Sequence, residues 1–222
     1  SKDETTDYSR RGEVDAYVSC GVNASLETKA TADSEIKEKE AKVQKLTALI
    51  FKGTDDNATF VTSKTETATG EATISEIKHL VVKVTPNADG TSSSDEFIAV
   101  FLGNCEDIAT PATLGALKKV VLTKKADSYA IGSVLPMASK EIKIKGLRPN
   151  IKKGDGSTDW YENWVKNGGG VVANATASET DPETAPDTYK ATDYVVLTRL
   201  ISRVQVESVK LKLTEYPGAS IT

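Results

Sequence analysis

Residues 13–23, EVDAYVSCGVN, decide the fold class of this chain. Their side chains alternate in polarity with a period of two, which is typical of a β-strand with one face in a core and the other in water. The apolar face holds Val14, Ala16, Val18, Cys20 and Val22, and the opposite face holds Glu13, Asp15, Tyr17, Ser19 and Asn23. The sequence therefore predicts an opening strand that buries one face.

Short apolar or alternating segments continue along the chain, separated by clusters of Gly, Asn, Asp, Ser and Thr. Residues 43–51 are apolar at both parities near their end, which predicts a central strand covered on both faces, and 97–102 is predicted to be a fully apolar strand. The polar stretch 87–94 is expected to be a long hairpin loop. Further strands are predicted at 60–63, 71–75, 77–85 (Leu80, Val82 and Val84 inward), 130–137, 140–145 (Ile142 and Ile144 inward) and 194–214, the last with a bulge or a change of partner at 207–208.

One helix is expected after residue 110. Thr110 suits the N-cap, Pro111 suits the first helical position, and Leu114, Leu117 and Val121 share a face. Many short strands, one short helix and frequent turns together predict an all-β fold of the β-sandwich type.

Composition excludes several classes of function. The 222 residues carry a net charge of −4, with 38% hydrophobic and 27% charged residues, as in an ordinary globular protein. This balance argues against nucleic acid as a partner, because such proteins need a concentrated basic surface. No run approaches the roughly 18 apolar residues of a membrane span, so any targeting segment is expected upstream of Ser1 or already removed.

The residues that could carry chemistry are few. His79 is the single histidine, placed on a predicted strand, and no nucleophile, phosphate loop or metal-ligand pattern accompanies it. We therefore expect no enzymatic activity, no cofactor and no metal. The two cysteines, Cys20 and Cys105, can pair in an oxidising compartment or remain as two buried thiols.

A long segment, 148–192, is rich in Gly, Asn, Asp, Thr and Pro and carries three neighbouring aromatic residues. Loops of this length are usually functional or disordered. The aromatic residues can contact a sugar or a protein, or fold back as a lid over an open edge of the core, and the lid is the favoured interpretation. They are Trp160, Tyr161 and Trp164.

Several segments, in their order along the chain, resemble one known family. The alternating first strand is followed by a charged connector and then by 41–53, AKVQKLTALIFKG; the other matching segments are 75–84, 97–104, 132–146 and 195–213. Together they are similar to the type V pilins of Bacteroidales, the FimA-type fimbrillins. The resemblance implies a transthyretin-like Greek-key β-sandwich and a structural role in an extracellular fimbria, for adhesion or biofilm formation.

The resemblance also implies how such a subunit is processed. It is exported as a lipoprotein with an outer-membrane lipid anchor, and a trypsin-like or gingipain-type protease then removes the first strand. A strand of a neighbouring pilin subunit fills the groove, so the partners are other subunits and the protease. The connector offers Lys29 as the processing site where the family usually has arginine. A Cys20–Cys105 disulfide would hold the strand after cleavage.

This interpretation divides the chain into parts. Residues 1–11 are expected to be a flexible tether, and 12–216 an N-terminal pilin domain in which strand 13–26 is removable and 27–41 is the connector. Residues 217–222 are expected to begin a linker to a C-terminal domain. An alternative function is a surface adhesin, or a tip or anchor module, that binds host proteins or glycans through the 148–192 loop.

Overall fold

The computed structural model describes residues 7–24, 38–90, 92–125, 133–147, 149–151, 179–180, 194–200 and 208–212. Within these ranges the chain is all-β apart from two short helical segments and one turn of helix at residues 38–40. The elements in chain order are η1 (Tyr8–Arg11), β1 (Val14–Ala24), β2 (Lys45–Lys52), β3 (Thr59–Thr67), β4 (Glu76–Val84), β5 (Glu96–Gly103), α2 (Leu114–Lys118), β6 (Val121–Lys125), β7 (Met137–Ala138), β8 (Ile142–Lys145), β9 (Glu179–Thr180), β10 (Tyr194–Arg199) and β11 (Ser208–Lys212).

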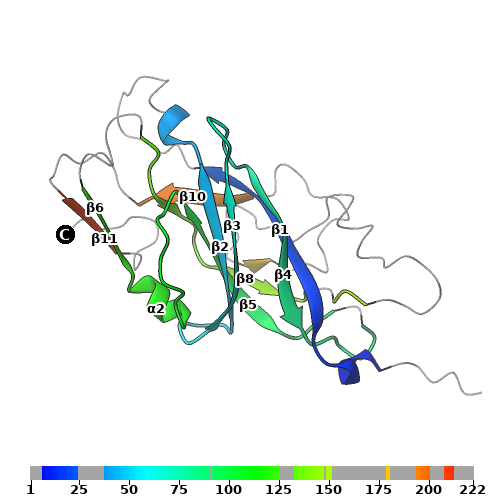
Figure 1. Ribbon diagram of the computed structural model, residues 1–222. Coiled ribbons are helices and arrows are strands. Elements are labelled where there is room, and N and C mark those ends of the chain that lie inside the picture. The colour runs from blue at the N-terminus through cyan, green and yellow to red at the C-terminus, as the bar shows by residue number, and fades with distance from the viewer. Residues whose placement is uncertain are drawn as a thin grey trace, which may run out of the picture.

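The strands form two layers that share one core (Figure 1). One layer has the order β3-β2-β5-β8, and the other has the order β10-β1-β4. The short β7 pairs with both β5 and β10 and so joins the layers into one hydrogen-bonded path. A separate pair, β6 with β11, lies to one side of the molecule beyond α2 (Figure 1). The predicted all-β fold is confirmed.

Strands β2 and β5 are central and are buried on both faces, as the sequence predicts. One parity of each strand faces β1, β4 and β10: Leu46, Ala48 and Ile50 from β2, and Phe97, Ala99 and Phe101 from β5. The other parity, including Phe51 and Val100, packs in a second cluster under α2. A strand with water on one side would not need apolar side chains at both parities.

The segment between β4 and β5 is not the hairpin loop that the sequence predicts. Residues 87–94 were expected to close a hairpin, but β4 pairs with β1 and β5 pairs with β2, so the two strands lie in different layers. The connection is therefore an arch across the sandwich, with a single bridge between Pro86 and Ser93. The expected inward face of β4 is confirmed, since Leu80, Val82 and Val84 are all buried.

Helix α2 begins later than predicted. Thr113, not Thr110, is the N-cap, and its hydroxyl accepts from the amide of Ala116 at 3.1 Å. The amide of Phe60 donates to the carbonyl of Ala112, which holds the preceding segment extended beside the start of β3. The predicted Leu114 and Leu117 are fully buried, whereas Val121 belongs to β6.

The remaining strand predictions are mixed. Residues 71–75 form no strand, and within its described part the segment predicted at 130–137 contributes only Met137, the first residue of β7. Ile142 and Ile144 face inward from β8 as expected. The chain changes partner between β10, which pairs with β1 and β7, and β11, which pairs with β6.

Asn104 directly follows β5, and its side chain links the end of this central strand to the start of β2. It has a φ of 54°, a left-handed conformation that asparagine tolerates. Its side-chain oxygen accepts from the amide of Gln44 at 2.8 Å, and its amide nitrogen donates to the carbonyls of Lys42 and Leu135. One side chain therefore ties the start of β2 and the segment before β7 to the end of β5.

Candidate functional site

The groove that holds β1 is the candidate site. Strand β1 does not lie at an edge: it pairs antiparallel with β4 from Val14–Val84 to Gly21–Glu76, and its last four residues pair parallel with β10. Figure 1 shows β1 and β4 side by side along one flank of the sandwich. Removal of an inner strand leaves unpaired backbone groups on both sides of the gap.

The inner face of β1 fills the core as its alternation predicts. Ala16, Val18 and Val22 are 0%, 1% and 7% exposed, and Val14 is partly buried against the same cluster. The side chain of Cys20 lies outside the described residues. Ser19, which was expected on the polar face, is buried as well. The register shifts between Val18, which pairs with Leu80, and Cys20, which pairs with Ile77. The extra residue therefore belongs to β4, and β1 keeps its alternation through Val22.

The first half of β1 is bordered by a loop instead of by β10. The backbone amide of Asn150 donates to the carbonyl of Asp15 at 2.7 Å, and the side-chain amide of Asn150 donates to the Tyr17 hydroxyl at 3.4 Å. On the other side, the Asp15 carboxylate forms an ion pair with Lys83 of β4. The polar face of β1 is therefore held by specific partners on the body.

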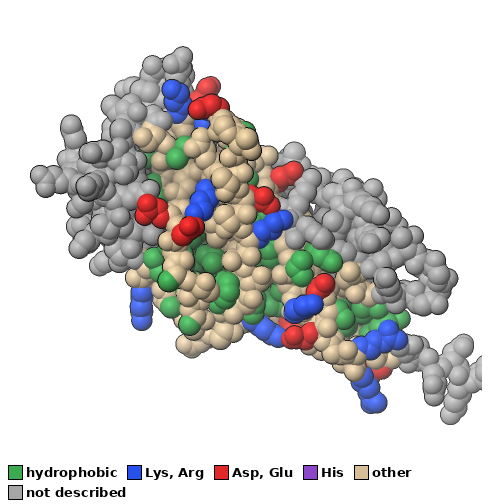
Figure 2. Space-filling view, in the orientation of Figure 1, with side chains coloured by type: hydrophobic (Ala, Val, Ile, Leu, Met, Phe, Trp, Pro, Cys, Tyr) green, Lys and Arg blue, Asp and Glu red, His purple; other side chains and the backbone are tan. Residues whose placement is uncertain are grey.

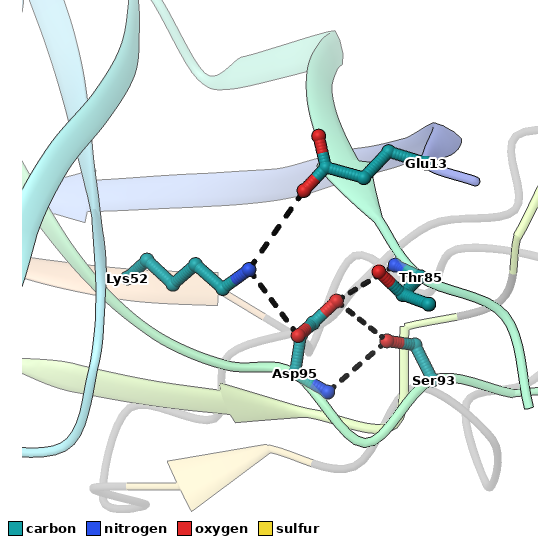
Figure 3. Close-up of polar contacts among 5 residues, drawn as sticks. All are labelled: Glu13, Lys52, Thr85, Ser93 and Asp95. Atoms are coloured by element: carbon teal, nitrogen blue, oxygen red, sulfur yellow. Dashed lines mark hydrogen bonds and ion pairs between the residues drawn. The ribbon is translucent and has the colours of Figure 1, made fainter.

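A polar cluster lies where β1 begins (Figure 3). The ammonium of Lys52 lies 3.9 Å from the Glu13 carboxylate and 3.3 Å from the Asp95 carboxylate. Asp95 in turn accepts from the backbone amide of Thr85 at 2.7 Å and from the Ser93 hydroxyl at 3.2 Å. The arch between β4 and β5 thus positions Lys52, through Asp95, to meet the residue that precedes β1.

The segment before β1 also docks on that arch, so residues 7–11, the described part of the expected flexible tether, have defined contacts with the body. Residues 8–11 form the 3-10 helix η1, capped by Asp7, and the Tyr8 amide donates to the carbonyl of Ala88 at 2.9 Å. Hydrogen bonds from Ser9 lower the pKa of Asp7. The Tyr8 ring covers Gly90, where a φ of +75° and a Cβ only 2.9 Å from the ring would exclude other residues.

The connector returns to the body through a buried ion pair. Glu40, at the end of the expected connector 27–41, contacts the guanidinium of Arg199 on β10 at 3.3 Å. This contact joins the chain just before β2 to β10. The expected processing residue Lys29 lies outside the described residues.

Cys105 is buried in the cluster under α2. Its sulfur lies 3.5 Å from the Gly103 carbonyl and 3.7 Å from that of Met137. The side chain of Cys20 lies outside the described residues, so the Cys20–Cys105 pairing stays a prediction.

The other candidate features of the sequence lie outside the described residues. They are Trp160, Tyr161, Trp164 and the side chain of His79. Among the residues that the structure describes, no group of His, Cys, Asp and Glu could hold a metal ion. No helix in the same part of the chain is long and apolar enough to span a membrane. Figure 2 shows basic and acidic side chains interspersed on the visible face.

Comparisons with solved structures give weak similarity over most of the chain. A fimbrilin (FimA) from Porphyromonas gingivalis W83 is 14% identical with a TM-score of 0.43, over 84% of this chain and 40% of its own. The tip fimbrial protein Mfa3 from the same species, truncated at its C-terminus, is 15% identical with a TM-score of 0.42, over 84% and 48%. A fimbrial assembly protein from Parabacteroides distasonis ATCC 8503 is 12% identical with a TM-score of 0.41, over 60% and 48%.

The chain therefore spans less than half of the length of these structures. A search of curated proteins found no match. A family model is more informative: the one described as "Major fimbrial subunit protein (FimA)" matches residues 16–181, from within β1 to just beyond β9. That family consists of structural subunits and is not an enzyme class. Because the match covers well over half of the sequence, the chain belongs to the FimA major fimbrial subunit family.

Proposed function

We propose that this chain is the N-terminal part of a fimbrial subunit that joins its neighbours by exchanging β1 for a strand of another subunit. The observation that carries the proposal is the position of β1. It lies inside the layer β10-β1-β4, buries its apolar face in the shared core, and is followed by a connector whose far end is held by Arg199 of β10.

The energetics favour a stable replacement. Burial of a valine side chain stabilises by about 1.5–3 kcal/mol as an upper estimate, and each backbone hydrogen bond adds about 0.5–1.5 kcal/mol. A foreign strand with the same alternation would recover both terms, with the backbone giving affinity and the alternate side chains giving register. Repeated head to tail, this contact does not close on itself and yields a filament.

We also propose that β1 leaves the groove after cleavage of the connector. A protease would cut the connector, with Lys29 as the candidate residue, after export of a lipoprotein precursor to the outer membrane. A disulfide between Cys20 and Cys105 would retain the strand after the cut, so the proposed exchange requires that these two residues are not bonded to each other. The assembled subunit would then lie in a fimbria at the cell surface, with other pilin subunits as its partners.

Cutting the connector tests the proposal. In the full-length gene product, a site for a sequence-specific protease placed at residues 28–31 would be cut, and assembly followed by size-exclusion chromatography and electron microscopy. We expect oligomers or fibres from the cut protein and monomers from the uncut protein. A cut protein that stays folded and monomeric, with the 1–29 fragment still bound, would contradict the proposal.

A further inference from the structure

Two lysines of the body lie at the end of the β1 groove where β1 begins. Lys83 of β4 forms its ion pair with Asp15, and Lys52 at the end of β2 approaches Glu13. The hydrogen bond and the charge of Asp15, with a further contribution from the charge of Glu13, raise the pKa of Lys83. Both lysines belong to the body, so they remain at the groove when β1 leaves.

The opposite end of the groove has a different character. There Glu76 of β4 lies opposite Gly21, which has no side chain, and the Val22 amide donates to the carbonyl of Ser75 at 2.8 Å. A carboxylate placed at the position of Gly21 would lie beside a second carboxylate. Among the described side chains of the rim, the two lysines lie near the start of β1 and the Glu76 carboxylate lies near its end, so an incoming strand meets different charges at its two ends.

The core-facing side of the groove limits the size of the side chain that a donor strand can place there. Ala16 is fully buried opposite Val82, in the centre of the core between the two layers. A larger side chain at this position would overpack the core, which typically costs about 1–3 kcal/mol. The body therefore accommodates a strand that has a small apolar residue at the position of Ala16 and an outward-facing carboxylate at the position of Asp15.

We propose that the vacated groove selects, as its donor, a strand of another pilin subunit that carries carboxylates at the positions of Glu13 and Asp15 and a small apolar residue at the position of Ala16. This inference rests on the proposed strand exchange. Complementary charges at a rim chiefly raise the association rate and fix the register. A slip of one residue would turn the carboxylates into the core, and a slip of two would carry Asp15 away from Lys83.

The proposed charge selection also disfavours some strands that alternate in polarity as β1 does. Residues 209–213 of this chain, VKLKL, alternate as β1 does but carry Lys210 and Lys212 where β1 carries acidic residues. Bound with their apolar face inward, these lysines would lie along a rim that already holds Lys83. We therefore expect this segment to be a poor donor, although hydrophobic alternation alone would admit it.

Peptide exchange into the cut, full-length chain tests the selection. The probes are fluorescent peptides of residues 12–24 with Cys20→Ala: one otherwise native, and one with Glu13→Lys and Asp15→Lys. The host chains are the native protein, Lys83→Glu, Lys83→Gln, and Lys143→Glu as a control for a change of charge on the exposed face of β8. Stopped-flow fluorescence gives the rate constant of exchange at low and high salt.

We expect the native peptide to enter the native host roughly fivefold faster than the Lys83→Glu host, and the basic peptide to show the reverse order. Lys83→Gln should lie between the two, Lys143→Glu should match the native host, and the differences should fade near about 1 M salt, where charges are screened. Equal rates for both peptides in every host would overturn the charge selection while leaving strand exchange intact. No exchange by any peptide would overturn strand exchange itself, and the selection with it.

Discussion

Replacement of Val18 with aspartate is expected to lower the free energy of unfolding by about 4 kcal/mol or more, or to prevent folding. Val18 lies at the centre of β1, is 1% exposed and pairs in register with the buried Leu80. A carboxylate at this position would lose its hydration and would meet only apolar neighbours in the core. Urea denaturation followed by circular dichroism measures the change.

Val81→Asp is the matched control, because Val81 pairs with Tyr17 on the other face of the same two strands and is 38% exposed. Its effect should remain within about 0.5 kcal/mol. Similar destabilisation by the two substitutions would show that the faces of β1 and β4 are not divided into core and solvent as described.

Deletion of residues 1–24 is expected to abolish cooperative folding of the isolated chain and to make it self-associate. Strands β4 and β10 would each lose a row of backbone partners, and the core would lose Ala16, Val18 and Val22. Taken together, these losses are comparable with the whole stability of a typical domain, about 5–15 kcal/mol. Thermal unfolding and light scattering measure both effects.

A chain that lacks only residues 1–6 serves as the control, because it keeps η1, its contact with Gly90 and all of β1. This chain should unfold at the temperature of the intact protein. If the longer deletion also left a monomer with an unchanged unfolding temperature, β1 would be dispensable and no vacant groove would drive assembly.

Much of the fold follows from local sequence pattern. Val14, Ala16, Val18 and Val22 alternate cleanly, and 97–102 is apolar at both parities, so the burial of β1 and β5 could be predicted without a structure. The burial of Ser19 could not, because its place in the alternation assigns it to the water-facing side of the strand. The start of α2 was missed for a similar reason: two threonines suit the cap, and contacts of residues 112–115 with 56–60 choose Thr113.

The candidate site, like the fold, could be predicted from the sequence only in part. Alternation identified β1 as a strand with one buried face, and the resemblance to the type V pilins made it the element of interest, but neither gave information on its neighbours. The docking of Tyr8 over Gly90, the Glu13–Lys52–Asp95 cluster and the Glu40–Arg199 pair join residues far apart in sequence. Isolated charged or aromatic residues of this kind carry no periodic signal, so only the folded chain reveals them.

The central claim is that β1 is replaceable within a folded subunit. Native mass spectrometry of the connector-cut, full-length protein with an excess of isotope-labelled peptide 12–24 tests it most directly. We expect the labelled peptide to replace the fragment that contains β1 mole for mole, while the body keeps its native circular dichroism spectrum. Retention of the original fragment, with the labelled peptide excluded over days, would contradict the claim.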